Sequence, residues 1–125
     1  MSAGRVKEAI PLIESQLALN PEDVLSARTL GLAYMKIGDY KSAIGPLELV
    51  AARMPRMDHI VVLGIACLSA GQRDEAIEMF KHVAEIGGGD QEMRGLSARL
   101  LDGVNHPEAL PDLQKFAAQL SSDWM

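Results

Sequence analysis

The residues best able to do chemistry are few and widely separated in the sequence. His59, His82 and His106 fall on different predicted helices or turns, and no HExxH motif is present. Cys67 is the single cysteine, so neither a CxxC pair nor an intrachain disulfide can form. Protein zinc sites use paired Cys and His ligands at short spacings. We therefore expect no catalytic residues, no metal site and no cofactor, and we expect that the protein is not an enzyme.

Two further motifs have a structural interpretation. The glycine run at 87–89 lacks the lysine of a phosphate-binding loop and follows a predicted helix rather than a strand. Asp58 and His59 form an isolated pair at the expected start of a helix, where an acidic side chain favours helix formation. We interpret the run as a joint and the pair as a helix cap, and neither as a ligand site.

Charge and hydropathy exclude two classes of partner. The net charge is −5 and the basic residues are dispersed, so we expect no binding to nucleic acid or to an anionic membrane surface. No stretch approaches the roughly 18 apolar residues that a membrane-spanning helix requires. The N-terminus has no apolar run of the signal-peptide type, and a lone cysteine fits a reducing compartment. These features predict a cytoplasmic protein without membrane insertion.

The elements that hold these residues are predicted to be helices. Hydrophobic residues make up 48% of the 125 residues, aromatic residues only 4%, and β-branched residues do not alternate with polar ones. Asn20 before Pro21 is typical of a helix start, and Gly38 and Gly71 are typical of helix ends. We expect the prolines at 11 and 46 near the starts of their helices. The predicted helices span residues 5–19, 22–37, 40–53, 57–70, 73–86, 90–103 and 107–121.

An internal repeat of 33 residues runs through the chain. Gly31 and Gly64 both stand inside predicted helices, where glycine costs about 1 kcal/mol relative to alanine. The residues that recur from the first copy to the second are Leu30, Gly31, Tyr34, Gly38, Ala43, Leu47 and Pro55, which become Leu63, Gly64, Cys67, Gly71, Ala76, Phe80 and Gly88. A third copy keeps only the apolar positions Leu96, Leu100, Ala109 and Leu113. A repeated helix-breaking residue at one interval indicates a helical repeat array.

These positions resemble the tetratricopeptide repeat family, whose pattern is W-x2-L-G-x2-Y, A-x3-F and a final proline. The resemblance implies an all-α fold, a right-handed superhelix of about seven antiparallel helices in one domain over residues 1–125. It places a half repeat at 4–21 and repeats at 24–56, 57–89 and 90–123. It also implies that Gly31 and Gly64 lie at close helix crossings near Ala43 and Ala76, and that Cys67 is a buried, inert thiol.

In this family the first helix of each pair lines a concave groove. The resemblance therefore assigns a peptide-binding groove to Leu25, Arg28, Thr29, Leu32, Met35, Lys36, Val61, Val62, Ile65, Leu68, Arg94 and Leu101. The centre of this set is apolar. It forms either the core of a tightly wound array or a trough covered by a peptide, by another subunit or by the chain's own tail. Trp124, the only tryptophan, lies in a tail that either frays or docks onto such a surface.

The groove predicts the type of partner. Some family members bind a carboxylate terminus with Lys and Asn, but Leu32 and Val62 occupy the Asn positions here. We therefore predict a protein–protein interaction module for an apolar or amphipathic peptide segment. Two alternatives remain open: a bacterial secretion-system chaperone for a hydrophobic export substrate, or a self-assembling scaffold subunit. The unpaired helix 5–19 suggests a homodimer through the N-terminal half repeat.

Overall fold

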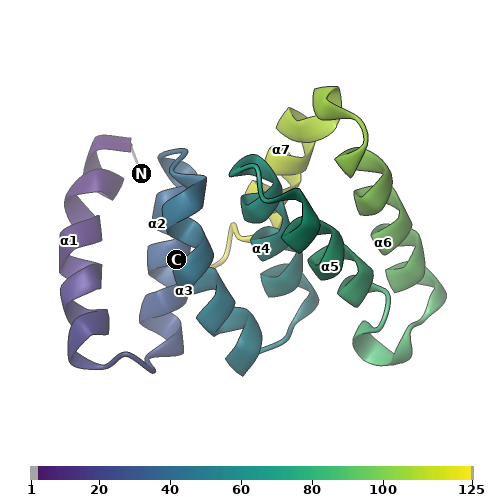
Figure 1. Cartoon of the computed structure of the whole chain (residues 1–125). Coiled ribbons are helices and arrows are strands. Elements are labelled where there is room, and N and C mark those ends of the chain that lie inside the picture. Colours follow the sequence, from purple (N-terminus) through teal and green to yellow (C-terminus); the bar gives the residue numbers. More distant parts are fainter. Residues whose placement is uncertain (1–2, 125) are drawn as a thin grey trace.

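Residues 3–124 are described by a computed structural model of the chain, and over this range they form seven α-helices and two short 3-10 helices without any strand (Figure 1). The all-α prediction is confirmed. Every predicted helix is present, with ends that differ by a few residues. The helices are α1 (Ala3–Leu19), α2 (Val24–Lys36), α3 (Tyr40–Arg53), α4 (Met57–Ser69), α5 (Arg73–Val83), α6 (Gln91–Val104) and α7 (Leu110–Leu120), and the 3-10 turns are η1 (Ile86–Gly88) and η2 (Pro107–Ala109).

The helix ends are set by local backbone and side-chain chemistry. Gly38 and Gly71 have φ angles of 78° and 83°, so both adopt the left-handed conformation that ends α2 and α4. The prediction of Asn20 as a cap is wrong. Asp23 caps α2 instead, because its carboxylate accepts a hydrogen bond from the Ser26 amide, and residues 20–23 form the turn.

Three predictions about proline-containing segments are also wrong. Pro11 and Pro46 lie well inside α1 and α3 rather than near their starts. The segment predicted as one helix over 107–121 begins with η2, and α7 follows with Pro111 in its first turn. Proline lacks the backbone N–H that an inner helical turn requires, and it is well tolerated in the first turn.

The helices pack as successive antiparallel neighbours from α1 to α6 (Figure 1). α2 pairs with α3, and α4 pairs with α5. The helix α4 is central, since every residue from His59 to Cys67 is buried. A smaller core of Val6, Ile10, Leu30 and Ala33 joins α1 to α2.

The two helix glycines make room for large side chains of the paired helix. A Cβ atom added at Gly31 would lie 2.7 Å from Leu47 Cδ2, and one added at Gly64 would lie 2.5 Å from Phe80 Cε1. The predicted close crossings therefore exist. The neighbours are Leu47 and Phe80, rather than the alanines predicted at 43 and 76, because the larger side chains fill the space that a missing Cβ leaves.

The last helix departs from the hairpin pattern. α7 packs mainly against α4, whereas α3 and α5 pack along the helix that precedes each of them. In Figure 1, α7 lies behind α4, and the chain then runs back toward α2. The C-terminal segment therefore returns across the face that α2, α4 and α6 share.

Candidate interaction groove

The groove is the face formed by α2, α4 and α6. On α4, Asp58 and Ser69 both bond to the C-terminal segment. Ser69 Oγ accepts a hydrogen bond from Gln114 Nε2 at 3.0 Å, and Asp58 Oδ2 accepts one from Trp124 Nε1 at 3.1 Å. Gln114 pairs with the end of α4 and Trp124 with its start, so α7 runs antiparallel to α4 along the groove.

The apolar centre of the groove lies beneath α7. Val62 and Ile65 share one helical face with Asp58 and Ser69, because these positions are spaced by four, three and four residues. Val62 is 1% exposed, and Ile65 is fully buried. The chain's own tail is therefore the covering of this face in the structure, one of the three coverings expected from the sequence.

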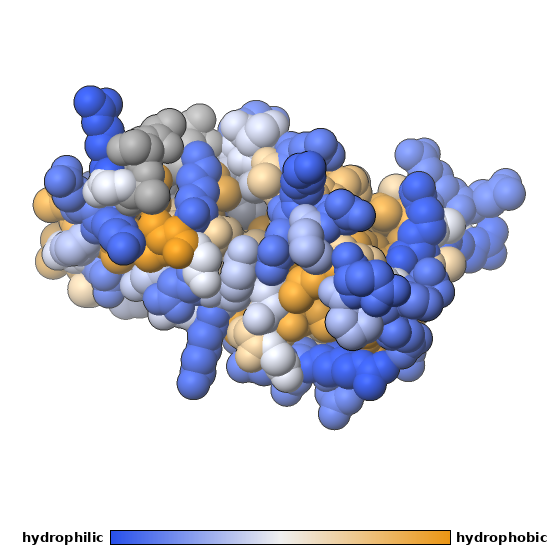
Figure 2. Space-filling model, turned by 90° about the horizontal axis from the view of Figure 1, so that it is seen from above, coloured by the Kyte–Doolittle hydropathy of each residue, from blue (hydrophilic) through white to orange (hydrophobic). Residues whose placement is uncertain are grey.

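The predicted groove residues divide into three groups by exposure. The buried group belongs to the core, and the other two line the rim of the groove or face solvent. Buried residues are Leu32, Val61, Val62 and Ile65; half-buried residues are Arg28, Thr29, Met35, Leu68 and Leu101; exposed residues are Leu25, Lys36 and Arg94. Figure 2 shows that hydrophobic residues on the face it presents lie in separate patches between hydrophilic side chains.

The segment that faces α4 has small residues between two larger polar anchors. Gln114 and Ala117 lie three residues apart on one side of α7, and Ser121 and Trp124 follow the end of the helix at Leu120. Ala117 is 1% exposed, and the Ser121 hydroxyl donates a hydrogen bond to the Ala117 carbonyl at 2.8 Å. Small side chains allow α7 to lie close to α4, and polar contacts hold it at both ends.

Trp124 docks rather than frays, and it is 5% exposed. Its ring meets the ring of His59 edge-on, with centroids 5.1 Å apart and an interplanar angle of 72°. The Arg28 guanidinium lies 5.7 Å from the indole centroid, within the range of a cation–π contact. Arg28, one of the predicted groove residues, lies half-buried against the tail.

Asp58 and His59 belong to the site, although from the sequence we expected them only to cap a helix. Burial by itself raises the pKa of Asp58, but the hydrogen bond from Trp124 and the charges of His59 and Arg56 bring it below its ordinary value. His59 Nδ1 bonds to the Met54 carbonyl at 2.8 Å. A lone tryptophan in the tail was the only signal for this contact, and it did not indicate which residues would receive the ring.

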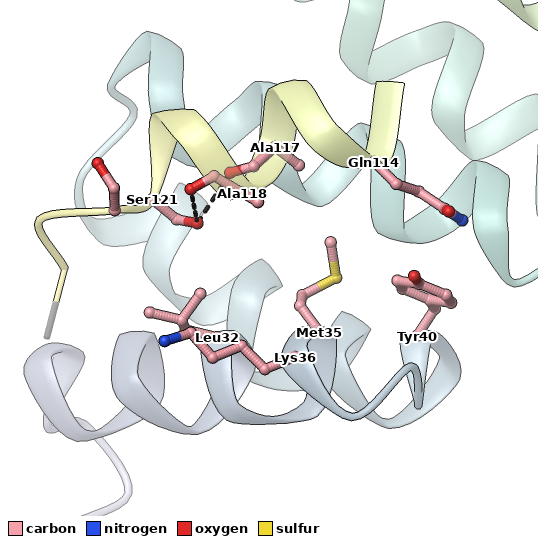
Figure 3. A pocket seen from close by; sticks show the side chains of 9 residues that line it. Leu32, Met35, Lys36, Tyr40, Gln114, Ala117, Ala118 and Ser121 are labelled. Carbon is pink, nitrogen blue, oxygen red and sulfur yellow. Dashed lines mark hydrogen bonds between the residues drawn. The ribbon is translucent and has the colours of Figure 1, made fainter. Parts of the chain in front are cut away.

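One part of the groove remains open between α2 and α7. This cleft has a volume of about 270 Å³. Figure 3 shows Met35 reaching from α2 toward α7, with Tyr40 facing Gln114. The lining residues are Leu32, Met35, Lys36, Tyr40, Gln114, Ala117, Ala118, Ser121 and Ser122. The floor is apolar, and Lys36 supplies a positive charge at the rim.

The other chemistry-bearing residues do not come together. Within residues 3–124, no group of three His, Cys, Asp or Glu side chains is arranged to hold a metal ion. Burial, followed by the charges of Glu48 and Glu75, raises the pKa of the Cys67 thiol to about 11. None of the helices over the same range combines the length and apolar character needed to cross a bilayer.

Comparison with known proteins connects this geometry to a family. The tetratricopeptide repeat model matches residues 60–94. The solved structure "MamA MSR-1 C2" is 30% identical with a TM-score of 0.65, and the match covers 95% of this chain and 69% of that one. A mutant form of MamA is 32% identical with a TM-score of 0.64, covering 94% and 69%. No curated protein sequence is matched.

The chain belongs to the tetratricopeptide repeat family. Members of this family are generally non-enzymatic scaffolds, and the fold together with its MamA-like neighbours identifies the chain as a protein–protein interaction module.

Proposed function

We propose that this module binds an apolar or amphipathic helical segment of a partner protein in the groove formed by α2, α4 and α6. The observation that carries the proposal is α7, a helix that already lies in the groove. It runs antiparallel to α4, with Ala117 at its centre and polar contacts from Gln114 and Trp124 at its ends. Recognition of an amphipathic helix in an apolar groove is a recurrent mode of peptide binding.

The open cleft supplies a surface for the first contact with a partner. Met35 lies half-buried at this cleft, and Lys36 is exposed at its rim. A partner helix that presents an apolar side chain toward Met35 and an acidic one toward Lys36 matches both groups. The cleft therefore favours a segment with one apolar face and an acidic flank.

The proposal is tested with substitutions at the rim rather than the centre. Val62 and Ile65 are buried in the core, so introducing a charge there would disrupt the fold as well as any site. Met35→Glu places a charge at the cleft, and Met79→Glu places the same charge on α5, outside the groove. Both methionines are half-buried, which makes them a matched pair.

The measurement is affinity for a partner captured from the native host and then purified. Titration calorimetry with the full chain should show at least a tenfold loss for Met35→Glu and a loss of less than twofold for Met79→Glu. Circular dichroism checks that both variants are folded. Equal affinity of the folded Met35→Glu variant and the unaltered chain would place the partner elsewhere.

Self-assembly is a second candidate, and the outer surface of α1 favours it. Leu12 is 70% exposed and Leu19 is 89% exposed, whereas Val6 and Ile10 of the same helix pack against α2. A second copy that covers these leucines would remove apolar surface from water. Light scattering should then show a dimer or larger assembly that Leu12→Ser with Leu19→Ser converts to a monomer. A monomeric unaltered chain at high concentration would exclude this function.

A further inference from the structure

We propose that α7 and Trp124 form a displaceable internal ligand, so that the groove is closed by the chain's own tail until a partner helix of similar pattern replaces it. The inference rests on the proposed groove function and adds the regulation of that site. The partner segment would present small side chains at its centre and an N–H-bearing aromatic ring near its C-terminal end, as α7 does with Ala117, Ser121 and Trp124.

α7 is buried less deeply than the central helix. Ala117 is the only buried residue within the helix, whereas α4 buries nine residues in succession. The larger apolar side chains of α7 are only half-buried, and three of them, Leu113, Phe116 and Leu120, pack against the edge of the core. Apolar stabilisation scales with the area removed from water. Undocking α7 therefore costs less free energy than displacing any helix of the central core.

The polar contacts of α7 can be exchanged for contacts with water or with a partner. Gln114–Ser69 and Trp124–Asp58 are side-chain hydrogen bonds in which Trp124 is buried and the other three residues are half-buried. Net hydrogen-bond contributions are modest where water can replace the lost partner. The 270 Å³ cleft along α2 also leaves one edge of α7 accessible, so a competing segment can bind there first.

The connection between α6 and α7 is short and exposed. Asn105 and His106 are exposed and separate the end of α6 from the short turn η2. A change in a few backbone angles at these two residues would swing α7 away while leaving α1 to α6 in place. The departure of α7 would uncover the apolar centre of the groove around Val62 and Ile65, and this surface requires a new apolar covering.

Hydrogen exchange of the full, unaltered chain tests whether α7 opens by itself. Backbone amides of α7 should exchange at least tenfold faster than those of α4, at a rate that low concentrations of urea barely change. Such behaviour indicates local opening rather than global unfolding. If α7 and α4 exchange together at the rate of global unfolding, α7 is an integral part of the core and the proposal is overturned.

A peptide with the sequence of residues 108–124 tests whether an opened groove accepts such a helix. The full-chain variant Ala117→Glu should expel its own α7, because a buried charge without a partner is strongly unfavourable. Fluorescence anisotropy with the labelled peptide should show at least tenfold tighter binding to this variant than to the unaltered chain. A peptide that itself carries Ala117→Glu is the matched control and should not bind either protein.

The two experiments distinguish the displacement of α7 from the binding of a helix in the groove. Peptide binding to the folded variant, combined with concerted exchange of α7 and α4, would refute displacement and leave the groove function standing. No peptide binding to a folded, opened variant would refute the helix-binding groove itself. Circular dichroism establishes folding, and Trp124→Ala, which removes the tail anchor without burying a charge, replaces Ala117→Glu if that variant unfolds.

Discussion

Substitution of Gly64 by alanine tests the physical basis of the repeat. Alanine is the better helix former by about 1 kcal/mol, so local propensity alone predicts stabilisation. The structure predicts the opposite, because the new Cβ would lie 2.5 Å from Phe80 Cε1, 2.9 Å from Phe80 Cδ1 and 3.2 Å from Met79 Cβ. Unstrained contacts between carbon atoms begin near 3.5 Å.

The magnitude follows from whether the neighbours can move. Phe80 is fully buried, so its ring cannot turn away into solvent. Overpacking of a well-packed core costs roughly 1–3 kcal/mol, and the propensity gain offsets about 1 kcal/mol of it. We therefore expect the free energy of unfolding to fall by about 1 kcal/mol in Gly64→Ala. Gly31→Ala should cost less, because the Leu47 side chain that it meets is more flexible than an aromatic ring.

Urea unfolding followed by circular dichroism measures the effect, with Gly95→Ala as the matched control. Gly95 lies inside α6, it is exposed, and a Cβ there would meet nothing within 4 Å. The control should raise the free energy of unfolding by up to about 1 kcal/mol. If Gly64→Ala stabilises the chain as much as Gly95→Ala does, close packing is not the reason for the repeated glycine.

Three further outcomes follow from individual side chains. Cys67, whose pKa burial raises to about 11, should resist a thiol reagent at pH 8 in the folded chain and react in urea, as a colorimetric thiol assay would show. Trp124 docking depends on ionised Asp58, whose pKa in the folded chain lies below its ordinary value of 3.8. The stabilisation that this contact gives is therefore full above pH 3.8. It is lost as the pH falls through the lower pKa of the folded chain. The Trp124 emission should therefore shift to the red below pH 3.8, and Asp58→Asn should abolish that transition. Ser97→Ala removes the buried hydrogen bond that the Ser97 hydroxyl donates to the Phe80 carbonyl at 2.6 Å, and denaturant unfolding should show a loss of about 1 kcal/mol.

The helix ends were predictable where one residue determines the local backbone. Gly38 and Gly71 could be assigned as left-handed helix ends because the conformation depends on the missing Cβ and on little else. The start of α2 was not predictable in this way. Asn20 and Asp23 are both good caps three residues apart, and the preference for Asp23 depends on its bonds to Ser26.

The groove could be located from the repeat register, but its occupant could not. Periodicity placed Val62 and Ile65 on the groove face, and that placement depends only on helical spacing. Their complete burial depends on α7, which lies about fifty residues further along the chain. Local patterns carry no direct information about such distant packing. The sequence therefore allowed Trp124 either to fray or to dock, and only the three-dimensional arrangement shows that it docks.

The departure of α7 from the hairpin pattern does have a local cause in the sequence. The glycine that ends α2 and α4 in the left-handed conformation is replaced by Val104 in the third copy, and α6 runs on to that residue. The glycine of the close crossing is replaced by Ser97, whose side chain bonds back to the preceding helix. Without a tight left-handed turn after it, α6 keeps only a displaced close approach to the next helix, in which a Cβ added at Gly103 would lie 3.1 Å from Leu113 Cδ1. α7 lies mainly along α4 instead, where Ala117 presents a small, buried side chain.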